Sequence, residues 1–120
     1  METQARAMTL HDIRNQIYQL PNRPPFMIAN DLAAIYQCDP RQIGQAVRRN
    51  PKRFPPRFCF RLEEAELKVL RSQNVTLLPK KAAHRILGFT RSGANMLSSI
   101  LRTDVAAERA VMIMDAFSAL

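Results

Sequence analysis

The sequence predicts an α+β fold with a helix-turn-helix core, short β-hairpins and a C-terminal helical pair. Apolar residues recur at helical spacing in several segments, prolines divide these segments, and one aromatic-rich stretch alternates as a strand does. With 120 residues and 47% hydrophobic content, the chain has the size of one domain with its own core. We expect residues 1–8 to form a flexible tail and residues 9–120 to form the single domain.

The beginning of the domain is expected to form a short helix and then a hairpin. Thr9 with Asp12 fits a capping box. Three apolar residues follow helical spacing there: Leu10, Ile13 and Ile17. Prolines 21, 24 and 25 exclude a helix from the next stretch. Residues 16–20 and 26–29 are therefore predicted to pair across that turn.

Two helices joined by a turn of three or four residues are predicted next. The first, capped by an Asn or Asp at its start, covers about residues 30–37. Asp39 is a good N-cap and Pro40 suits the first helical position, so the second covers about residues 40–49. Asn50 tolerates a left-handed cap, and the proline after it blocks continuation. Three apolar residues of the second helix are expected to face the core: Ile43, Ala46 and Val47.

A strand, a helix and a second hairpin are predicted in the middle of the chain. In residues 58–62, alternating Phe58, Phe60 and Leu62 indicate a strand. Three glutamates favour a helix start after it, because carboxylates stabilise a helix N-terminus: Glu63, Glu64 and Glu66. Residues 75–78 and 85–89 flank a basic Pro-Lys-Lys-Ala-Ala stretch and are expected to form the hairpin. Thr90 and Asp104 then cap the two C-terminal helices.

The charge distribution favours a nucleic-acid partner. Lys and Arg number 18 against 10 acids, which gives a net charge of +8 and a pI near 10.5. Between Asp39 and Glu63, and again between Glu66 and Asp104, no acid occurs, and these two stretches hold 14 of the 18 basic residues (7 plus 7). A merely solvated surface would intersperse both signs. A small, strongly basic domain most often meets nucleic acid.

The two helices of residues 30–49 fit a helix-turn-helix that places its second helix in the major groove of duplex DNA. Five polar side chains of that helix are expected to face outward: Arg41, Gln42, Gln45, Arg48 and Arg49. Arg can fork onto guanine and Gln onto adenine. The usual turn glycine is absent, and Gln37 stands near its position. Any two short helices joined by a turn can mimic this pattern.

Five further basic residues complete the predicted DNA-binding set: Lys52, Arg53, Lys80, Lys81 and Arg85. The last three belong to the predicted second hairpin and are expected to contact phosphates as a wing does. Lys52 and Arg53 follow the recognition helix. They can also be solvated charges, and Arg53 can instead bond backbone carbonyls.

Several runs of the sequence together resemble a known family. They include Asp31-Leu32-Ala33-Ala34-Ile35-Tyr36, Arg48-Arg49-Asn50 with Arg53-Phe54-Pro55, and Met96-Leu97-Ser98-Ser99. In order and over about residues 13–120, they resemble the DNA-binding N-terminal domain of phage and prophage antirepressor-type proteins, the "ORF-six N-terminal" family related to KilA-N. Departures include Gln37 for a Gly and Gly44 for an Asn. The resemblance implies sequence-directed duplex DNA binding and a role in phage gene regulation. The polar, acidic N-terminus, Met1-Glu2-Thr3-Gln4, does not have the layout of a signal peptide, so we expect the protein in the bacterial host cytoplasm, associated with the nucleoid.

Enzymatic, cofactor and metal readings find little support. Gly88 and Gly93 mimic the start of a phosphate loop, but Ala94-Asn95 stands where Lys-Ser/Thr is required. The cysteines and histidines lack zinc spacing, and no apolar run is long enough to span a membrane. The sequence therefore predicts no enzyme and no cofactor. The alternatives are an antirepressor-type module that binds a repressor or other regulator protein through its C-terminal helices and, more weakly, RNA binding.

The last helix is expected to mediate assembly. One apolar stripe steps by four and three residues: Ala106, Ala110, Ile113, Phe117 and Leu120. Val105, Met112 and Met114 make the opposite side apolar as well, with no obvious cover within a short chain. Soluble monomers rarely expose such a patch. We therefore expect a homodimer through residues 104–120, with two recognition helices placed for paired half-sites.

Overall fold

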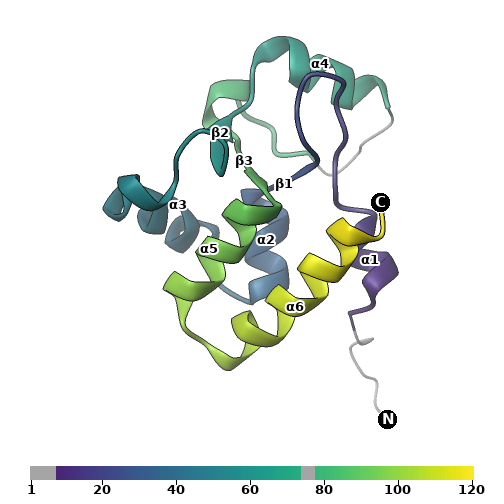
Figure 1. Ribbon diagram of the computed structural model, residues 1–120. Helices are drawn as coiled ribbons and strands as arrows, with labels where there is room; N and C mark the ends of the chain where they lie inside the picture. Colours follow the sequence, from purple (N-terminus) through teal and green to yellow (C-terminus); the bar gives the residue numbers. More distant parts are fainter. Residues whose placement is uncertain (1–7, 74–77) are drawn as a thin grey trace.

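The computed structural model describes residues 8–73 and 78–120 and confirms an α+β architecture (Figure 1). The elements are α1 (Leu10–Arg14), β1 (Phe26–Ile28), α2 (Ala29–Tyr36), α3 (Pro40–Arg49), η1 (Pro51–Arg53), β2 (Cys59–Arg61), α4 (Glu64–Ser72), η2 (Ala83–Arg85), β3 (Leu87–Thr90), α5 (Arg91–Leu101) and α6 (Asp104–Ser118), η1 and η2 being 3₁₀ turns. Within these two ranges no helix is long and apolar enough to cross a membrane. The predicted tail falls mostly on residues 1–7, outside the described ranges.

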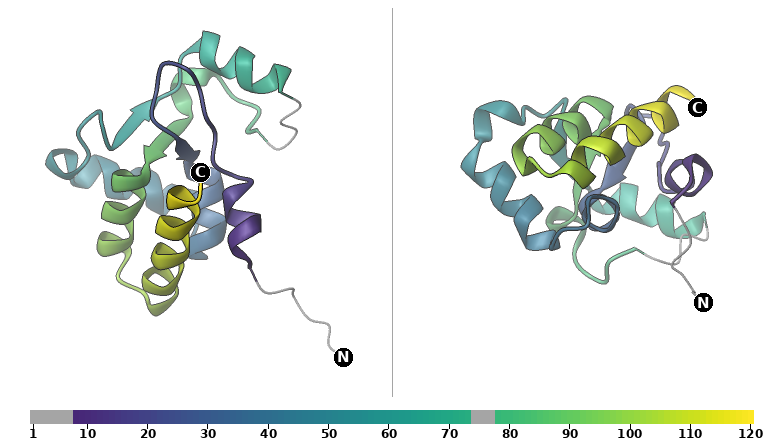
Figure 2. Two further views of the ribbon diagram at one scale, coloured as in Figure 1. Left: turned by 45° about the vertical axis from the view of Figure 1, so that its right-hand side comes forward. Right: turned by 90° about the horizontal axis from the view of Figure 1, so that it is seen from below.

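The three strands form one antiparallel sheet in the order β1–β3–β2. Neighbouring rows across it face opposite sides. One row enters the larger of two cores: Met27, Phe89 and Cys59. The next row faces the smaller core: Ile28, Gly88 and Phe60. The sheet is thus covered on both faces and separates a helical layer of α1, α2, α3, α5 and α6 from a cap that contains α4 and η2 (Figures 1 and 2).

Two polar contacts hold the helices of the larger core together. The Tyr36 hydroxyl at the end of α2 donates to the Ala94 carbonyl in α5 over 2.8 Å. Arg109 of α6 donates to the Ile35 carbonyl over 3.3 Å and so satisfies an open acceptor at the C-terminus of α2. These bonds fix α2, the helix on which α3 rests, against the C-terminal pair.

The first predicted hairpin is confirmed in part. Residues 16–20 pair with β1 through one antiparallel bridge, between Tyr18 and Phe26, with N–H to carbonyl distances of 2.8 and 3.0 Å, and β1 pairs over its whole length with β3, which was not predicted. The first strand of the second predicted hairpin, residues 75–78, lies mostly outside the described ranges, and β3 of its second strand pairs with β1 and β2. Local alternation reports strand character and says nothing of a distant partner. In the strand predicted over residues 58–62, Phe60 and Leu62 pack with the smaller core and Cys59 is buried in the larger core, because both faces of the sheet are covered.

Most predicted helix starts are confirmed, and two N-caps are shifted. Capping boxes are present at Thr9 of α1 and Asp39 of α3, and Thr90 caps α5. The cap of α2 is Ile28, not Asn30 or Asp31, because β1 runs directly into the helix. The cap of α6 is Thr103, not Asp104, since the Thr103 hydroxyl accepts from the Ala106 N–H over 3.0 Å.

The left-handed cap predicted at Asn50 is wrong. Its φ is −133°, and the chain continues directly into η1. Gln37 after α2 and Arg102 after α5 adopt the left-handed conformation instead, with φ of 57° and 58°. Each of these helices is followed by a short turn and then by a helix that packs against it. A left-handed residue reverses the chain direction within such a short turn.

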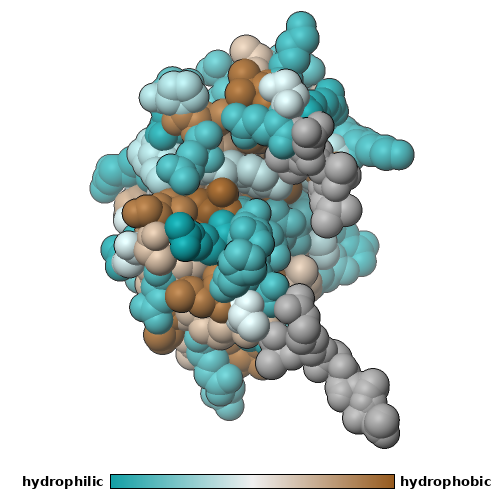
Figure 3. Space-filling view, turned by 90° about the vertical axis from the view of Figure 1, so that its right-hand side faces the viewer, coloured by the Kyte–Doolittle hydropathy of each residue, from teal (hydrophilic) through white to brown (hydrophobic). Residues whose placement is uncertain are grey.

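The final helix has more cover than predicted. Its stripe is buried from Ala106 to Phe117, but Leu120 beyond the helix end is 44% exposed. The α5 and α1 helices flank α6 and α2 also contacts it, and Met112 and Met114 pack partly against the larger core (Figure 2). The expectation of a second face without intramolecular cover is therefore wrong, because α1 supplies much of it. On the side opposite α3, apolar side chains lie in separate groups among hydrophilic ones (Figure 3).

Candidate functional site

The α2 and α3 helices pack against each other across the turn of residues 37–39. Gln37 turns the chain with φ 57° and ψ 50°, and the Cys38 N–H donates a hydrogen bond to the Ala33 carbonyl over 2.9 Å. The position where glycine is usual thus keeps the conformation that favours glycine, although the residue is Gln. The turn aims α3 away from the body of the molecule (Figure 1).

The start of α3 is held by a cluster of exposed polar groups. The Asp39 carboxylate accepts from the Arg41 N–H over 2.8 Å and from the Arg41 guanidinium over 3.2 and 3.3 Å. These hydrogen bonds lower the pKa of Asp39. The side-chain carbonyl oxygen of Gln42 accepts a hydrogen bond from the Asp39 N–H over 2.9 Å. Arg41 and Gln42, both predicted to contact DNA, are therefore engaged at the helix start.

The inward and outward faces of α3 largely match the prediction. Ile43 is fully buried and Ala46 is buried, while Val47 is half-buried at the edge of the core. All ten predicted DNA-binding residues are exposed: Arg41, Gln42, Gln45, Arg48, Arg49, Lys52, Arg53, Lys80, Lys81 and Arg85. Lys52 and Arg53 lie on η1, directly after α3.

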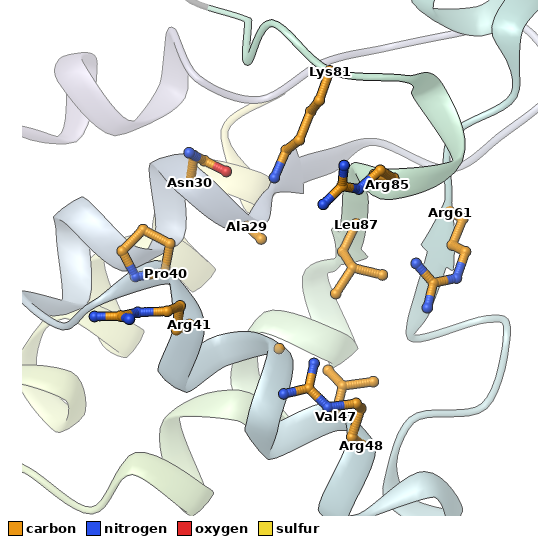
Figure 4. A pocket seen from close by; sticks show the side chains of 11 residues that line it. Ala29, Asn30, Pro40, Arg41, Val47, Arg48, Arg61, Lys81, Arg85 and Leu87 are labelled. Carbon is orange, nitrogen blue, oxygen red and sulfur yellow. The ribbon is translucent and has the colours of Figure 1, made fainter.

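A basic hollow of about 330 Å³ lies beside α3 (Figure 4). Its walls come from α3, the start of α2, β2, β3 and the segment that leads into η2. Five cationic side chains line it, with no acid among the lining residues: Arg41, Arg48, Arg61, Lys81 and Arg85. Arg48, Arg61, Lys81 and Arg85 extend toward the hollow, whereas Arg41 points away from it. The structure thus brings four predicted residues and one unpredicted residue to one place.

Arg61 is the basic residue that sequence reasoning missed. It pairs with Leu87 in the sheet, on the face that carries Cys59 and Phe89, but beyond the edge of the core. Its Nη1 donates to the His84 carbonyl over 3.0 Å, which ties β2 to η2. Strand parity counted from a buried Cys59 would have placed Arg61 on this face. Its proximity to α3 depends on the pairing of β2 with β3, which the sequence does not reveal.

Gly44 forms part of the α3 wall of the hollow. A Cβ built on it would meet only the Arg48 Nη1 atom, at 3.2 Å, the far end of a flexible side chain. Packing therefore does not require glycine here, and glycine in a helix interior costs about 1 kcal/mol relative to alanine. The result is a stretch of α3 that is bare of side chain and faces the cationic wall opposite.

The other predicted residues lie off the hollow: Gln42, Gln45, Arg49, Lys52, Arg53 and Lys80. Counted by helical periodicity, Gln45 and Arg48 lie near the pole of α3 opposite Ile43 and Ala46. The α3 surface thus has two parts, an outward ridge with Gln45 and Arg48 and a flank that forms one wall of the hollow.

Comparison with known proteins places the chain in a family. A family model described as the ORF6N domain matches residues 15–100, most of the chain, and this range contains the α2–α3 pair and every residue of the hollow. No curated protein and no solved structure matches the chain. The chain therefore belongs to the ORF6N domain family, a family of phage antirepressor-type N-terminal domains.

Proposed function

We propose that the protein binds duplex DNA in a sequence-directed manner, as the DNA-binding domain of a phage-type transcriptional regulator in the bacterial cytoplasm. The observation that carries this proposal is the exposed ridge of α3, where Arg and Gln side chains project from a helix anchored by Ile43 and Ala46. A short helix packed on a second helix through a tight turn is the helix-turn-helix geometry that enters the major groove.

Base readout is assigned to the ridge of α3. Gln45 and Arg48 are exposed; a Gln amide can donate to adenine N7 and accept from its N6 amino group, and an Arg guanidinium can donate to guanine N7 and O6. Gln42 uses its carbonyl oxygen in the capping box, which leaves its amide NH₂ for a base edge. Arg41 can exchange Asp39 for a phosphate at small cost, because fully exposed ion pairs contribute little to stability.

Phosphate contacts are assigned to the basic residues around α3. Lys52 and Arg53 extend the basic surface past the end of the helix, and Lys80, Lys81 and Arg85 lie across the hollow or next to it. Such contacts fix the register of the protein on the duplex and carry no sequence information. Each phosphate neutralised also releases counterions, so affinity should fall steeply with salt.

The test is a selection of bound sequences from random duplexes, followed by anisotropy titration of Arg48→Ala. Loss of a bidentate base contact should cost about 1–3 kcal/mol at the preferred site and relax the preference at one base pair. Arg14→Ala removes the same charge from α1, on the opposite side of the molecule, and should leave the preference intact (Figure 1). Equal weakening of preferred and scrambled duplexes by Arg48→Ala would make it a phosphate contact. Absence of any enriched sequence would contradict sequence-directed binding.

A second candidate is capture of a repressor or other regulator protein through the C-terminal helices. It is favoured by membership of an antirepressor-type family and by Val111, an α6 residue that is 61% exposed. A pull-down of a regulator that survives nuclease treatment and is abolished by Val111→Glu would support it. A pull-down abolished by nuclease would attribute capture to bound DNA.

A further inference from the structure

We propose that the basic hollow beside α3 is a phosphate site that holds one phosphodiester of the bound duplex, with Arg61 as its main ligand and Gly44 as its floor. This inference rests on the proposed function and deepens it, because it separates the two walls of the hollow by role. The α3 ridge reads bases, and the opposite wall holds the backbone of the same DNA.

The charge and shape of the hollow favour a bound anion. Arg61, Lys81 and Arg85 extend from the wall opposite α3 toward a space of about 330 Å³ that no acidic residue lines, and Arg48 borders this space from α3 (Figure 4). These cations repel one another in the free protein, and an anion between them offsets that repulsion. Phosphate oxygens are the acceptors that guanidinium groups bind in pairs.

A hydrogen bond holds the Arg61 side chain beside the hollow before any ligand binds. One N–H of its guanidinium donates to the His84 carbonyl over 3.0 Å, which restrains the side chain beside the hollow and leaves its other donors for a ligand. Side chains held before binding lose less conformational entropy when a ligand arrives. The same bond holds η2, and with it Arg85, at the rim. Arg61 therefore combines a ligand role with a positioning role.

Gly44 leaves room for a ligand beside the α3 backbone. It faces the hollow, yet no neighbouring backbone requires a glycine there. Glycine allows a close approach of a ligand to the helix backbone. In a helix that lies in the major groove, the flanking DNA strand passes along the side of the helix, and the bare surface at Gly44 lets a phosphate lie between α3 and Arg61.

The experiment is a coupling measurement between Arg61 and single phosphates. Arg61→Gln is compared with wild type on the selected duplex, in which one phosphate at a time is replaced by a neutral methylphosphonate. We expect one position whose replacement weakens wild type about tenfold but leaves Arg61→Gln unchanged. On the unmodified duplex, Arg61→Gln should also lower the slope of log K against log salt by about 0.9.

Three matched variants make the result decisive. Arg14→Gln changes the net charge equally, and we expect it to couple to no phosphate. Arg61→Lys keeps the charge and should keep the salt slope while losing part of the affinity, because an ammonium cannot replace the fork. Gly44→Ala should raise the midpoint of thermal unfolding yet weaken DNA binding. Additive effects of Arg61→Gln and every methylphosphonate, or equal losses with Arg14→Gln, would overturn the inference.

A titration with inorganic phosphate and pyrophosphate separates this inference from the proposed function. If wild type binds no duplex at any salt, the proposed function fails and a duplex phosphodiester is excluded as the occupant. Amide shifts of Gly44 and Arg61 in NMR spectra with pyrophosphate would then assign the hollow to a free anion. If the duplex binds with its preference intact in Arg61→Gln and without phosphate coupling, the proposed function stands and the hollow assignment is wrong.

Discussion

Replacement of Arg23 should destabilise the cap that covers the sheet. Arg23 lies in the segment between α1 and β1 and forms a two-bond ion pair with Glu66 of α4, one bond measuring 3.0 Å. Its guanidinium also stacks over the Phe60 ring, with 3.8 Å to the centroid. The Glu66 side chain is only 5% exposed and also accepts from the Glu63 N–H over 2.8 Å and from the Asn22 side chain. In the Arg23→Met variant, the Glu66 carboxylate remains buried but loses its ion-pair partner.

The magnitude follows from these contacts. Removing one partner of a buried ion pair costs about 3–5 kcal/mol, and the lower end applies because Arg23 is 21% exposed. The lost stacking on Phe60 adds about 0.5–1 kcal/mol. We therefore expect a loss of about 3–4 kcal/mol at pH 7, a large part of the 5–15 kcal/mol typical of a domain. The melting temperature should fall by roughly 12–16 °C.

Urea unfolding followed by circular dichroism at pH 7 and pH 4 tests this reasoning. Burial raises the pKa of Glu66, but the bonds from Arg23 and the Glu63 N–H outweigh it and hold the pKa below its ordinary value. A depressed pKa stabilises the fold above the unfolded value of about 4.3, and that stability is lost as pH falls through the folded pKa. Arg23→Met keeps the hydrogen bonds from the Glu63 N–H and the Asn22 side chain but removes Arg23, the partner that lowers the pKa of Glu66 most, so Glu66 is protonated more readily and the variant should approach wild type at pH 4. Arg23→Met with Glu66→Gln should recover much of the loss at pH 7. A loss below 1 kcal/mol, or an equal loss at both pH values, would refute the account.

Three further predictions concern the turn, a half-buried acid and assembly. Gln37→Gly should stabilise the fold by about 0.5–1 kcal/mol, because a left-handed non-glycine residue costs about 1–2 kcal/mol and glycine loses part of that gain as entropy; a lower urea midpoint would contradict this. Burial raises the pKa of Asp31 to about 6, so the neutral form of its carboxyl group favours the fold and wild type loses stability as pH rises through 6. In urea unfolding, Asp31→Asn should therefore be more stable than wild type by up to about 3 kcal/mol at pH 8 and no more stable below pH 4. For the homodimer predicted through residues 104–120, light scattering at micromolar concentration should show twice the mass of the chain, with Val111 and Leu120 at the contact, and a single 13.7 kDa species would exclude it.

Local chemistry made much of this fold predictable. The Asp39-Pro40 start of α3 and the Thr90 start of α5 depend on hydrogen bonds within one turn, so the sequence alone locates them. The inward Ile43 and outward Arg48 follow from helical period once the start is known. For the same reason the five predicted DNA-binding residues of α3 are exposed in the structure.

Non-local packing accounts for the failures. The pairing of β3 with β1 and β2 joins strands that lie far apart in the chain, and no local pattern encodes such partners. That pairing brings Arg61 to the hollow, so the residue could not be assigned beforehand. The cover of α6 by α1 likewise joins the two ends of the described chain. A short α1 carries too weak a signal in the sequence to show that it packs there.

The most direct test of DNA binding through the α3 face is an NMR titration of the labelled chain with its selected duplex. The account predicts that amide shifts gather on residues 40–53, Arg61 and residues 80–85, that the α1 and α6 amides stay in place, and that a scrambled duplex gives smaller shifts which vanish at higher salt. Shifts that gather on α6 while α3 is unchanged, or no shifts with any duplex at low salt, would contradict it.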